Sequence, residues 1–351
     1  MTSGVLEINL NSIKLNWCAL NELSGTKVET AAVVKANAYG LGVSKVAPFL
    51  WNVGVKTFFV SSMDEAVEMK SLVPNNAKIF CLNGYNFGDR QAVDEFDVIP
   101  IINSSDQLQN FIKAHPDSIA ALQIDIGMNR LGLQEDEFYR CKNQLLSLNI
   151  DLIMGHLSSA DEKDAVANKE QLYRFYELSR FFPKVTKSLS ATGGILLGKD
   201  YHFNLTRPGI GLFGGYPFCS AEQVIRINLP ILQVKTISRG DGVGYNHTFI
   251  SDRRRNIAVV GAGYADGLFR LLSNRGHLFH NGQKCPIVGR ISMDLITVDI
   301  SSLDKVPACL EVLGPSQSID NLADQAETIG YEILTNIGRR YKRVYHEDKR
   351  F

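Results

Sequence analysis

Short apolar runs alternate with amphipathic segments along the first two thirds of the chain. The run 31–34 contains no polar residue, which fits a strand buried on both faces of a parallel sheet. Segments 64–72 and 106–114 begin with acidic side chains, which suit helix N-termini. The pattern predicts strands at 31–35, 57–61, 78–82, 98–102, 120–125 and 151–155, with less distinct ones at 187–191 and 207–211.

The order of these segments predicts the fold class. Repeating strand–helix units indicate parallel strands joined by right-handed crossovers. Eight such units would close a (β/α)8 barrel, whose usual length is about 250 residues. A doubly wound open sheet is the alternative, and the number of expected strands favours the barrel.

The sequence pattern changes after about residue 229, where the helix-like segments mostly disappear. Short β-rich runs follow at 233–238, 256–261, 278–280, 286–288, 296–300 and 309–313. Asn281-Gly282 is the clearest hairpin turn, and 320–328 and 331–336 look like short helices. We therefore expect an α/β protein with an N-terminal (β/α)8 TIM-like barrel over residues 9–228 and a C-terminal mostly-β domain over residues 229–351.

Composition excludes several classes of function. Of the 351 residues 45% are hydrophobic and 21% charged, and 37 basic side chains balance 37 acidic ones, so no nucleic-acid role is expected. No apolar run approaches the roughly 20 residues of a membrane helix, and the N-terminus does not resemble a secretory signal. The six cysteines lack CxxC spacing, which argues against a zinc site or a disulfide framework. We expect a cytoplasmic protein without a metal site or a membrane partner.

Candidate chemistry lies where the expected strands end, because the C-terminal ends of barrel strands form the active site of such folds. Lys35 ends the first strand in apolar surroundings. Burial lowers the pKa of a lysine, and the neutral amine can then attack a carbonyl, so Lys35 is a candidate Schiff-base lysine. Taken alone, this segment would more readily be interpreted as carrying a salt-bridged lysine at a strand end.

Two glycine-containing segments, 192–194 and 207–211, follow the seventh strand and open the eighth unit. Adjacent in a barrel, they would present backbone N–H groups to a phosphate. A phosphate site together with an end-of-strand lysine indicates a pyridoxal phosphate (PLP) enzyme. Each piece also has a structural interpretation: a common turn at 192–194, a partly buried His156, and ion-paired Arg130 and Arg207.

Ordered motifs along nearly the whole chain resemble those of the alanine racemase family. They are VVKANAYGLG, DIGMNRLG, GHLSSAD, TRPGIGLFGG, GVGYNHTF, GAGYADGLFR, PIVGRISMD and YEILTNIGRRYKRVYH, between residues 33 and 346. The resemblance implies a PLP barrel followed by a β domain into which residues 1–8 pair. It also implies a head-to-tail homodimer whose active sites are shared between one barrel and the β domain of the other subunit.

The resemblance also implies roles for individual residues. Lys35 matches the PLP lysine and the base for the D-enantiomer, and Tyr245 matches the opposing base for the L-enantiomer, supplied by the other subunit. Arg207 matches the arginine facing the pyridine nitrogen, with His156 hydrogen-bonded behind it. The phosphate-binding positions are Tyr39, Thr192, Gly209, Ile210 and Tyr345; the substrate-binding ones are Arg130, Met293 through its backbone N–H, and Tyr264 at the substrate entrance.

Three positions depart from the family pattern. Gln123 stands where many members have a carbamylated lysine that holds the carboxylate-binding arginine. An amide can hydrogen-bond Arg130 but cannot form a bidentate ion pair, so we expect Arg130 to be less fixed or held by another anion. Thr192 replaces a serine and keeps the hydroxyl, and Leu295 replaces a glutamine without an arguable consequence.

The expected activity is PLP-dependent interconversion of L- and D-alanine, supplying D-alanine for peptidoglycan. Gln123 leaves open a serine or broad-specificity racemase on the same fold, because a looser Arg130 would tolerate other substrates. A non-catalytic PLP-binding or homeostasis protein is the alternative of another class. Those proteins have a similar barrel but lack the β half, so the β-rich residues 229–351 speak against that alternative.

Overall fold

The chain divides into two units, which are described separately. The computed structural model describes residues 4–347, with only the main chain of Phe87, and residues 1–3 and 348–351 lie outside that description. Residues 14–221 form one unit, and residues 4–13 with 222–347 form the other. The sequence placed the boundary at 228/229. The structure places it at 221/222, since β11 (Ile225–Ile237) is one continuous strand of the second unit.

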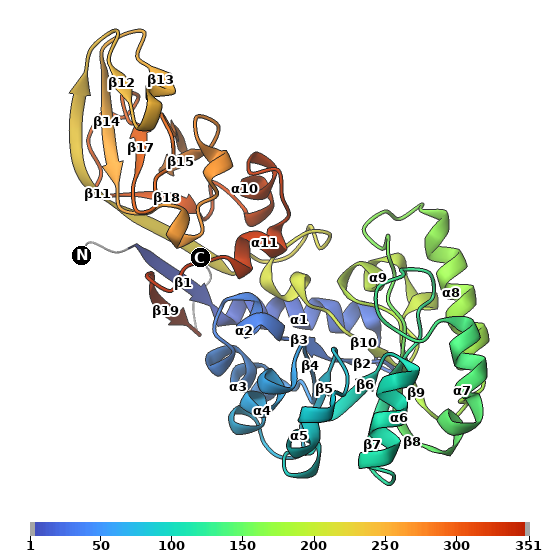
Figure 1. Cartoon of the computed structure of the whole chain (residues 1–351). Helices are drawn as coiled ribbons and strands as arrows, with labels where there is room; N and C mark the ends of the chain where they lie inside the picture. Colours follow the sequence, from blue (N-terminus) through green and yellow to red (C-terminus); the bar gives the residue numbers. More distant parts are fainter. Residues whose placement is uncertain (1–3, 348–351) are drawn as a thin grey trace. The chain divides into compact units, whose positions relative to one another are not determined.

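Parallel strands form the wall of the first unit (Figure 1). In the described residues they make a seven-stranded sheet that follows chain order. The strands are β3 (Ala32–Val33), β4 (Thr57–Val60), β5 (Lys78–Cys81), β6 (Ile99–Ile102), β7 (Ile119–Gln123), β8 (Asn149–Met154) and β9 (Thr186–Ser188). Those expected from 57 to 155 are confirmed to within two residues, because continuous apolar runs are typical of strands buried on both faces.

Two short strands close this wall into a barrel. β10 (Leu205–Thr206) pairs in parallel with β2 (Glu29–Thr30), which precedes β3. On its other side, the Arg207 N–H donates to Ser190 O just beyond β9, at 2.8 Å. The barrel is therefore confirmed over the open sheet. The eighth strand expected at 207–211 is wrong, because Pro208 has no N–H and residues Ile210–Phe213 form a 3-10 turn, η3.

Helices follow the strands in turn (Figure 1). They are α3 (Val43–Val53), α4 (Met63–Leu72), α5 (Arg90–Asp94), α6 (Ser105–Ala114), α7 (Glu135–Ser147), α8 (Val166–Ser179) and α9 (Thr192–Leu197), with α1 (Leu10–Ser24) ahead of them. The two helices predicted from acidic starts are confirmed as α4 and α6. Ser62 and Ser104 cap them by accepting backbone N–H groups of Glu65 and Gln107. No helix within residues 4–347 is long and apolar enough to cross a membrane.

The second unit is built on antiparallel strands. Its main sheet has the order β16-β15-β18-β11-β1-β19, with β14 and β17 attached beside β11. The strands are β1 (Val5–Asn9), β14 (Arg255–Val260), β15 (His277–His280), β16 (Gln283–Pro286), β17 (Ile296–Asp299), β18 (Cys309–Leu313) and β19 (Lys342–His346). β12 (Gly242–Val243) and β13 (Phe249–Ile250) form a separate ribbon, and α10 (Ile319–Gln325) and α11 (Gly330–Thr335) are short helices.

The N-terminal strand is part of this sheet. β1 runs antiparallel to β11 and parallel to β19, with Ile8 opposite both Ile225 and Tyr345. The pairing expected for residues 1–8 falls partly on residues 1–3, which lie outside the described chain.

A two-residue turn joins β15 and β16. Its residues Asn281 and Gly282 both have positive φ, 48° and 79°, and His280 pairs with Gln283 across it. The predicted hairpin is therefore confirmed. The strand expected at 286–288 is only partly right: β16 already ends at Pro286, Ile287 forms an isolated β-bridge with Val298, and the Val288 N–H donates to Thr297 O.

Buried hydroxyl groups reinforce the closure of the barrel, which gives a first prediction. Thr206 on β10 is fully buried, and its Oγ1 lies 2.9 Å from Ser24 Oγ and 3.3 Å from Thr30 Oγ1. Thr206→Val removes both bonds at nearly constant volume, so we expect the free energy of unfolding to fall by about 1–3 kcal/mol. Urea denaturation followed by circular dichroism measures this change.

The matched control is Thr186→Val on β9. The Thr186 side chain is partly exposed and has no hydrogen-bond partner in residues 4–347. Equal stability of the two variants would contradict a role for the buried hydroxyl cluster in barrel closure.

Candidate active site

The first strand of the barrel leads directly into a left-handed turn. In α2 (Lys35–Tyr39) the four residues after Lys35 all have positive φ, between 52° and 56°. Left-handed helical geometry costs roughly 1–2 kcal/mol for each residue with a Cβ, and consecutive L-residues rarely adopt it. Such strain persists only where surrounding contacts impose it, and it concentrates at functional sites.

Glu65 supplies the contacts that hold this turn. Its Oε1 accepts the backbone N–H of Ala36 at 2.7 Å, and its Oε2 accepts that of Ser61, just after β4, also at 2.7 Å. Within the turn, the Asn37 side chain accepts the N–H of Val43 at 2.8 Å. One carboxylate on α4 thus ties the ends of two neighbouring strands together and fixes the main chain beside Lys35.

The surroundings of Lys35 favour its neutral form. Burial of the amine is the main cause of its lowered pKa, and the positive charge of Arg130 adds to the effect. Glu65 acts in the opposite direction and limits the shift. A larger share of neutral amine makes Lys35 a better nucleophile than a solvated lysine.

Arg207 is a buried cation on the inside of the barrel. Only 2% of it is exposed, and its guanidinium donates to Ser188 Oγ and, at 2.8 Å, to Gly155 O. Burial lowers its pKa to about 9, so it remains charged at neutral pH. No carboxylate within residues 4–347 forms an ion pair with it. Its charge is therefore held by neutral oxygens and stays available to an anionic or basic ligand.

His156 does not make the bond expected of it. No hydrogen bond joins His156 to Arg207 within the described chain, because the guanidinium N–H groups point to the oxygens of Ser188, Gly155 and Leu189. Burial and the cations of Arg207, Arg130 and Lys35 lower the pKa of His156 to about 3. It is a neutral ring next to three positive charges, so it adds no further charge to them.

The predicted phosphate-binding residues of the barrel lie together. Thr192 Oγ1 accepts the backbone N–H groups of Gly209 and Gly211, both at 3.2 Å. An added Cβ at Gly209 would collide with the Tyr39 hydroxyl, so this close approach requires glycine. Ile210 lies between the two glycines at the start of η3. The Tyr39 hydroxyl thus lies close to Gly209, whose N–H, like that of Gly211, donates to the Thr192 hydroxyl.

Arg130 lacks a described partner for its side chain. Gln123 is buried, and its Nε2 donates to Leu131 O at 2.9 Å rather than contacting Arg130. The Arg130 side chain is exposed and has no hydrogen-bond or ion-pair partner in residues 4–347. The described residues thus supply neither a bond from Gln123 nor another anion to Arg130, and its looser fixation stays a prediction.

Asp125 organises the loop that carries Arg130. Its Oδ1 accepts three successive backbone N–H groups, those of Gly127, Met128 and Asn129, at 2.9–3.1 Å. Asp125 opens the motif DIGMNRLG, but neither its role as an acceptor nor the Glu65 clamp was predicted from the sequence. An aspartate two residues before a glycine is a turn signal that could have identified Asp125.

The other predicted site residues belong to the second unit. Tyr245, in a 3-10 turn between β12 and β13, is 68% exposed. Tyr264 and Met293 lie on adjacent loops, since the Tyr264 N–H donates to Ser292 O and the Ala265 N–H to Met293 O. Tyr345 lies on β19. Within residues 4–347, no group of three or more His, Cys, Asp or Glu side chains is arranged to hold a metal ion.

Comparisons with known proteins agree with this arrangement. The family model for the N-terminal domain of alanine racemase matches residues 8–217, and the model for its C-terminal domain matches residues 224–345. The chain belongs to the alanine racemase family. An alanine racemase from Cereibacter sphaeroides is 46% identical over 345 residues, which cover 98% of this chain and 99% of that protein. This chain is accordingly an enzyme of the isomerase class.

A second relative and a solved structure extend the comparison across the family. A protein named catabolic alanine racemase from Agrobacterium fabrum is 40% identical, covering 98% of this chain and 92% of that protein. The crystal structure of alanine racemase from Bartonella henselae, with covalently bound pyridoxal phosphate, superposes with a TM-score of 0.94 at 36% identity. That match covers 98% of this chain and 99% of the other.

The Glu65 clamp gives a second prediction. Glu65→Gln keeps one acceptor oxygen but turns an amide N–H₂ toward a backbone N–H, so the left-handed turn loses part of its support. Because hydrogen bonds to charged groups contribute about 1.5–3 kcal/mol, we expect a fall in the free energy of unfolding of about 2 kcal/mol. Urea denaturation of the protein measures it.

Glu68→Gln on the same helix is the matched control, since the Glu68 side chain is exposed and forms no side-chain bond in residues 4–347. If the two variants are equally stable, Glu65 does not hold the turn.

Proposed function

We propose that this enzyme is a PLP-dependent alanine racemase that interconverts L- and D-alanine. One observation carries the proposal: an amine with a lowered pKa lies on a clamped turn whose last residue, Tyr39, packs against Gly209, and the N–H groups of Gly209 and Gly211 converge on Thr192 Oγ1. A nucleophilic lysine beside a phosphate-sized set of donors is what covalent binding of PLP requires.

The residues of the barrel fit this cofactor. Lys35 would link to it covalently, while Tyr39, Thr192, Gly209 and Ile210 would receive its phosphate, together with Tyr345 of the second unit. A Cβ added at Gly209 or Gly211 would collide with the side chain of Tyr39 or Thr192, respectively, which explains why both positions are glycine. When bound, PLP supplies electron withdrawal that makes the substrate Cα–H acidic.

Arg207 would face the pyridine nitrogen of the cofactor. A guanidinium that remains protonated at neutral pH donates a hydrogen bond but no proton, so that nitrogen stays unprotonated. Electron withdrawal by the cofactor is then moderate, which restrains side reactions. His156, neutral beside Arg207, fills space behind it without competing for the negative charge of the ligand.

Racemisation needs a base on each face of Cα, because the proton leaves one face and returns to the other. Lys35 Nζ would exchange the proton of the D-enantiomer, and Oη of Tyr245 from the partner subunit that of the L-enantiomer. A tyrosine with a pKa near 10 needs nearby cations or donors to act as a base. Arg130 and the backbone N–H of Met293 would bind the substrate carboxylate, and Tyr264 would line its entrance.

A homodimer with shared sites is part of the proposal. Large apolar side chains of the second unit are exposed, namely Tyr245, Ile250, Tyr264, Leu271, Met293 and Leu295. Exposed groups of this kind are typical of surfaces that a partner covers. The loops of Tyr245 and Met293 are neighbours, since an added Cβ at Gly244 would lie 3.3 Å from Arg290 N. Covering them with a second barrel would complete both halves of the site.

The remaining parts of the proposal concern the cellular location of the enzyme and the range of its substrates. We propose a cytoplasmic enzyme that provides D-alanine for peptidoglycan. The exposed, unpartnered Arg130 and the turned-away Gln123 favour a second candidate, a racemase of serine or of several amino acids, because a mobile carboxylate clamp tolerates more side chains. A non-catalytic PLP-binding protein would need no opposing base, so full activity of Tyr245→Phe would support that alternative.

A third prediction tests the reaction. The protein loaded with PLP should show the visible absorbance of lysine-linked cofactor, and it should racemise L-alanine. Lys35→Ala should lose both, whereas Lys45→Ala, an exposed lysine on the next helix, should lose neither. The ratio of kcat/KM for alanine, serine and lysine decides the substrate. Bound PLP without racemisation of any small amino acid would overturn the proposal.

A fourth prediction tests the shared site. Lys35→Ala and Tyr245→Phe homodimers should each be nearly inactive. A mixed dimer, isolated through two different affinity tags, contains one site with both native bases and should recover about half of the wild-type activity. No recovery in an isolated mixed dimer would contradict sharing of the site between subunits.

A further inference from the structure

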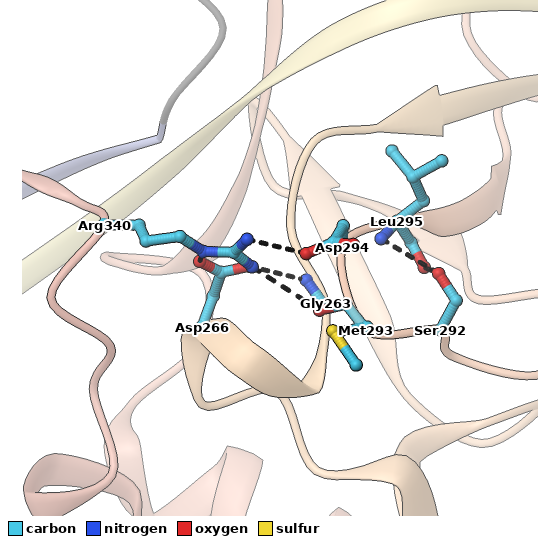
Figure 2. A network of polar contacts seen from close by, with 7 residues as sticks. All are labelled: Gly263, Asp266, Ser292, Met293, Asp294, Leu295 and Arg340. Carbon is cyan, nitrogen blue, oxygen red and sulfur yellow. Dashed lines mark hydrogen bonds and ion pairs between the residues drawn. The ribbon is translucent and has the colours of Figure 1, made fainter.

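One arginine joins two loops of the second unit (Figure 2). Nε and Nη2 of Arg340 donate to the two carboxylate oxygens of Asp266, at 2.8 and 2.6 Å. Its remaining nitrogen, Nη1, donates to Oδ1 of Asp294 at 2.6 Å. Asp266 lies two residues after Tyr264, and Asp294 follows Met293. The guanidinium therefore links the loop of the proposed entrance residue to the loop of the proposed carboxylate donor.

Asp266 is well suited to anchor this link. It is 6% exposed, and its Oδ2 also accepts the backbone N–H of Gly263 at 2.9 Å. A buried carboxylate that receives a bidentate guanidinium and a backbone donor is held in one orientation. Arg340 inherits that orientation although half of its own side chain is exposed.

The main chains of the same segments are packed directly on each other. An added Cβ at Gly263 would collide with the carbonyls of Ser292 and Met293, and one at Gly338 would lie 2.8 Å from Asp266 Cα. The Gly338 N–H donates to Asp266 O at 3.1 Å. Nη2 of Arg340 also donates to the Met293 carbonyl, at 3.5 Å, so the guanidinium contacts the main chain of the Met293 loop as well as its Asp294 side chain.

We propose that Arg340 is a positioning residue that sets the Met293 backbone N–H against Tyr264 and thereby determines how tightly the substrate carboxylate is bound. The proposal rests on the proposed function, which assigns that N–H to the carboxylate. The position of the Met293 N–H matters more for carboxylate binding in this protein, because Arg130, the other proposed carboxylate ligand, has no described partner. Arg340 makes no contact with substrate in this proposal and takes part in no proton transfer.

Arg340→Lys is the informative substitution, because lysine keeps the charge but cannot bridge two carboxylates in a fixed plane. The KM for L-alanine should rise about tenfold with kcat changed less than about twofold, the signature of lost ground-state and transition-state binding alike. Inhibition and equilibrium binding of propionate, a carboxylate without the amino group, should weaken by the same factor. Propionate binding, followed by the cofactor fluorescence, does not depend on turnover.

Arg275→Lys is the matched control: Arg275 pairs with Glu327, and both side chains are more than half exposed. It should leave KM and propionate binding unchanged. Should Arg340→Lys fail to fold, Asp294→Asn severs only the exposed end of the link and should raise both constants about threefold, since a neutral acceptor binds the guanidinium more weakly.

Unchanged KM and propionate binding in these variants would overturn the proposal, as would a fall in kcat at constant KM. If the wild-type protein racemises no amino acid while Arg340→Lys still weakens propionate binding, the proposed function fails and the positioning role stands. If alanine is racemised and propionate binding is unaffected, the positioning role fails alone.

Discussion

The arrangement of the barrel site depends on one carboxylate that holds an unfavourable main-chain conformation. Four L-residues after Lys35 adopt left-handed geometry, and the Glu65 side chain bonds both to this turn and to the end of the next strand. A regular right-handed start would turn Lys35 and Tyr39 in different directions from those seen. The left-handed turn therefore allows one short segment to orient both the Lys35 amine and the Tyr39 phenol. The strain of this turn persists because the hydrogen bonds of Glu65 hold it.

The same site concentrates positive charge. The charge of Arg130 lowers the pKa of Lys35, and the pKa of His156 is lowered by all three cations of the site. No carboxylate of the described residues forms an ion pair with Arg207. Burying cations without counter-ions is unfavourable until an anion arrives. In the proposed function, a ligand carrying a phosphate and a substrate carrying a carboxylate would supply the missing negative charge. Burial is the main cause of the lowered pKa of Lys35, and the positive charge of Arg130, which would also attract such an anion, adds to it.

The sequence predicts the barrel well because its evidence is local. Continuous apolar runs mark the strands from 57 to 155, and acidic starts mark two helices that the structure contains. The eighth strand was misplaced because Arg207-Pro-Gly carries strand-like neighbours but no donor at Pro208. Of the site, the barrel residues proposed to bind a phosphate lie together, since the strand-end rule places them there.

What the sequence does not reveal depends on contacts between distant residues. The left-handed turn contains Ala, Asn and Tyr rather than glycines, so its residue types do not predict a left-handed conformation. The orientation of Arg207 toward Ser188 and Gly155, rather than toward His156, depends on which oxygens the closed barrel brings near it. Motifs name residues that touch ligands, whereas partners such as Glu65 and Asp125 act through the main chain.

Glu65 and Arg340 show one principle in the two units. In each, a charged side chain outside the reacting groups bridges two loops and fixes backbone N–H groups that cannot be changed by mutation. A side-chain ligand such as the one proposed for Arg130 can change by substitution, but a backbone donor such as the one proposed for Met293 can only be moved. Altering the residues that hold the main chain is therefore the available route to tuning such a site. The departure at Gln123 makes this route more consequential, because a weakly held Arg130 leaves more of the recognition of a carboxylate to the fixed main chain.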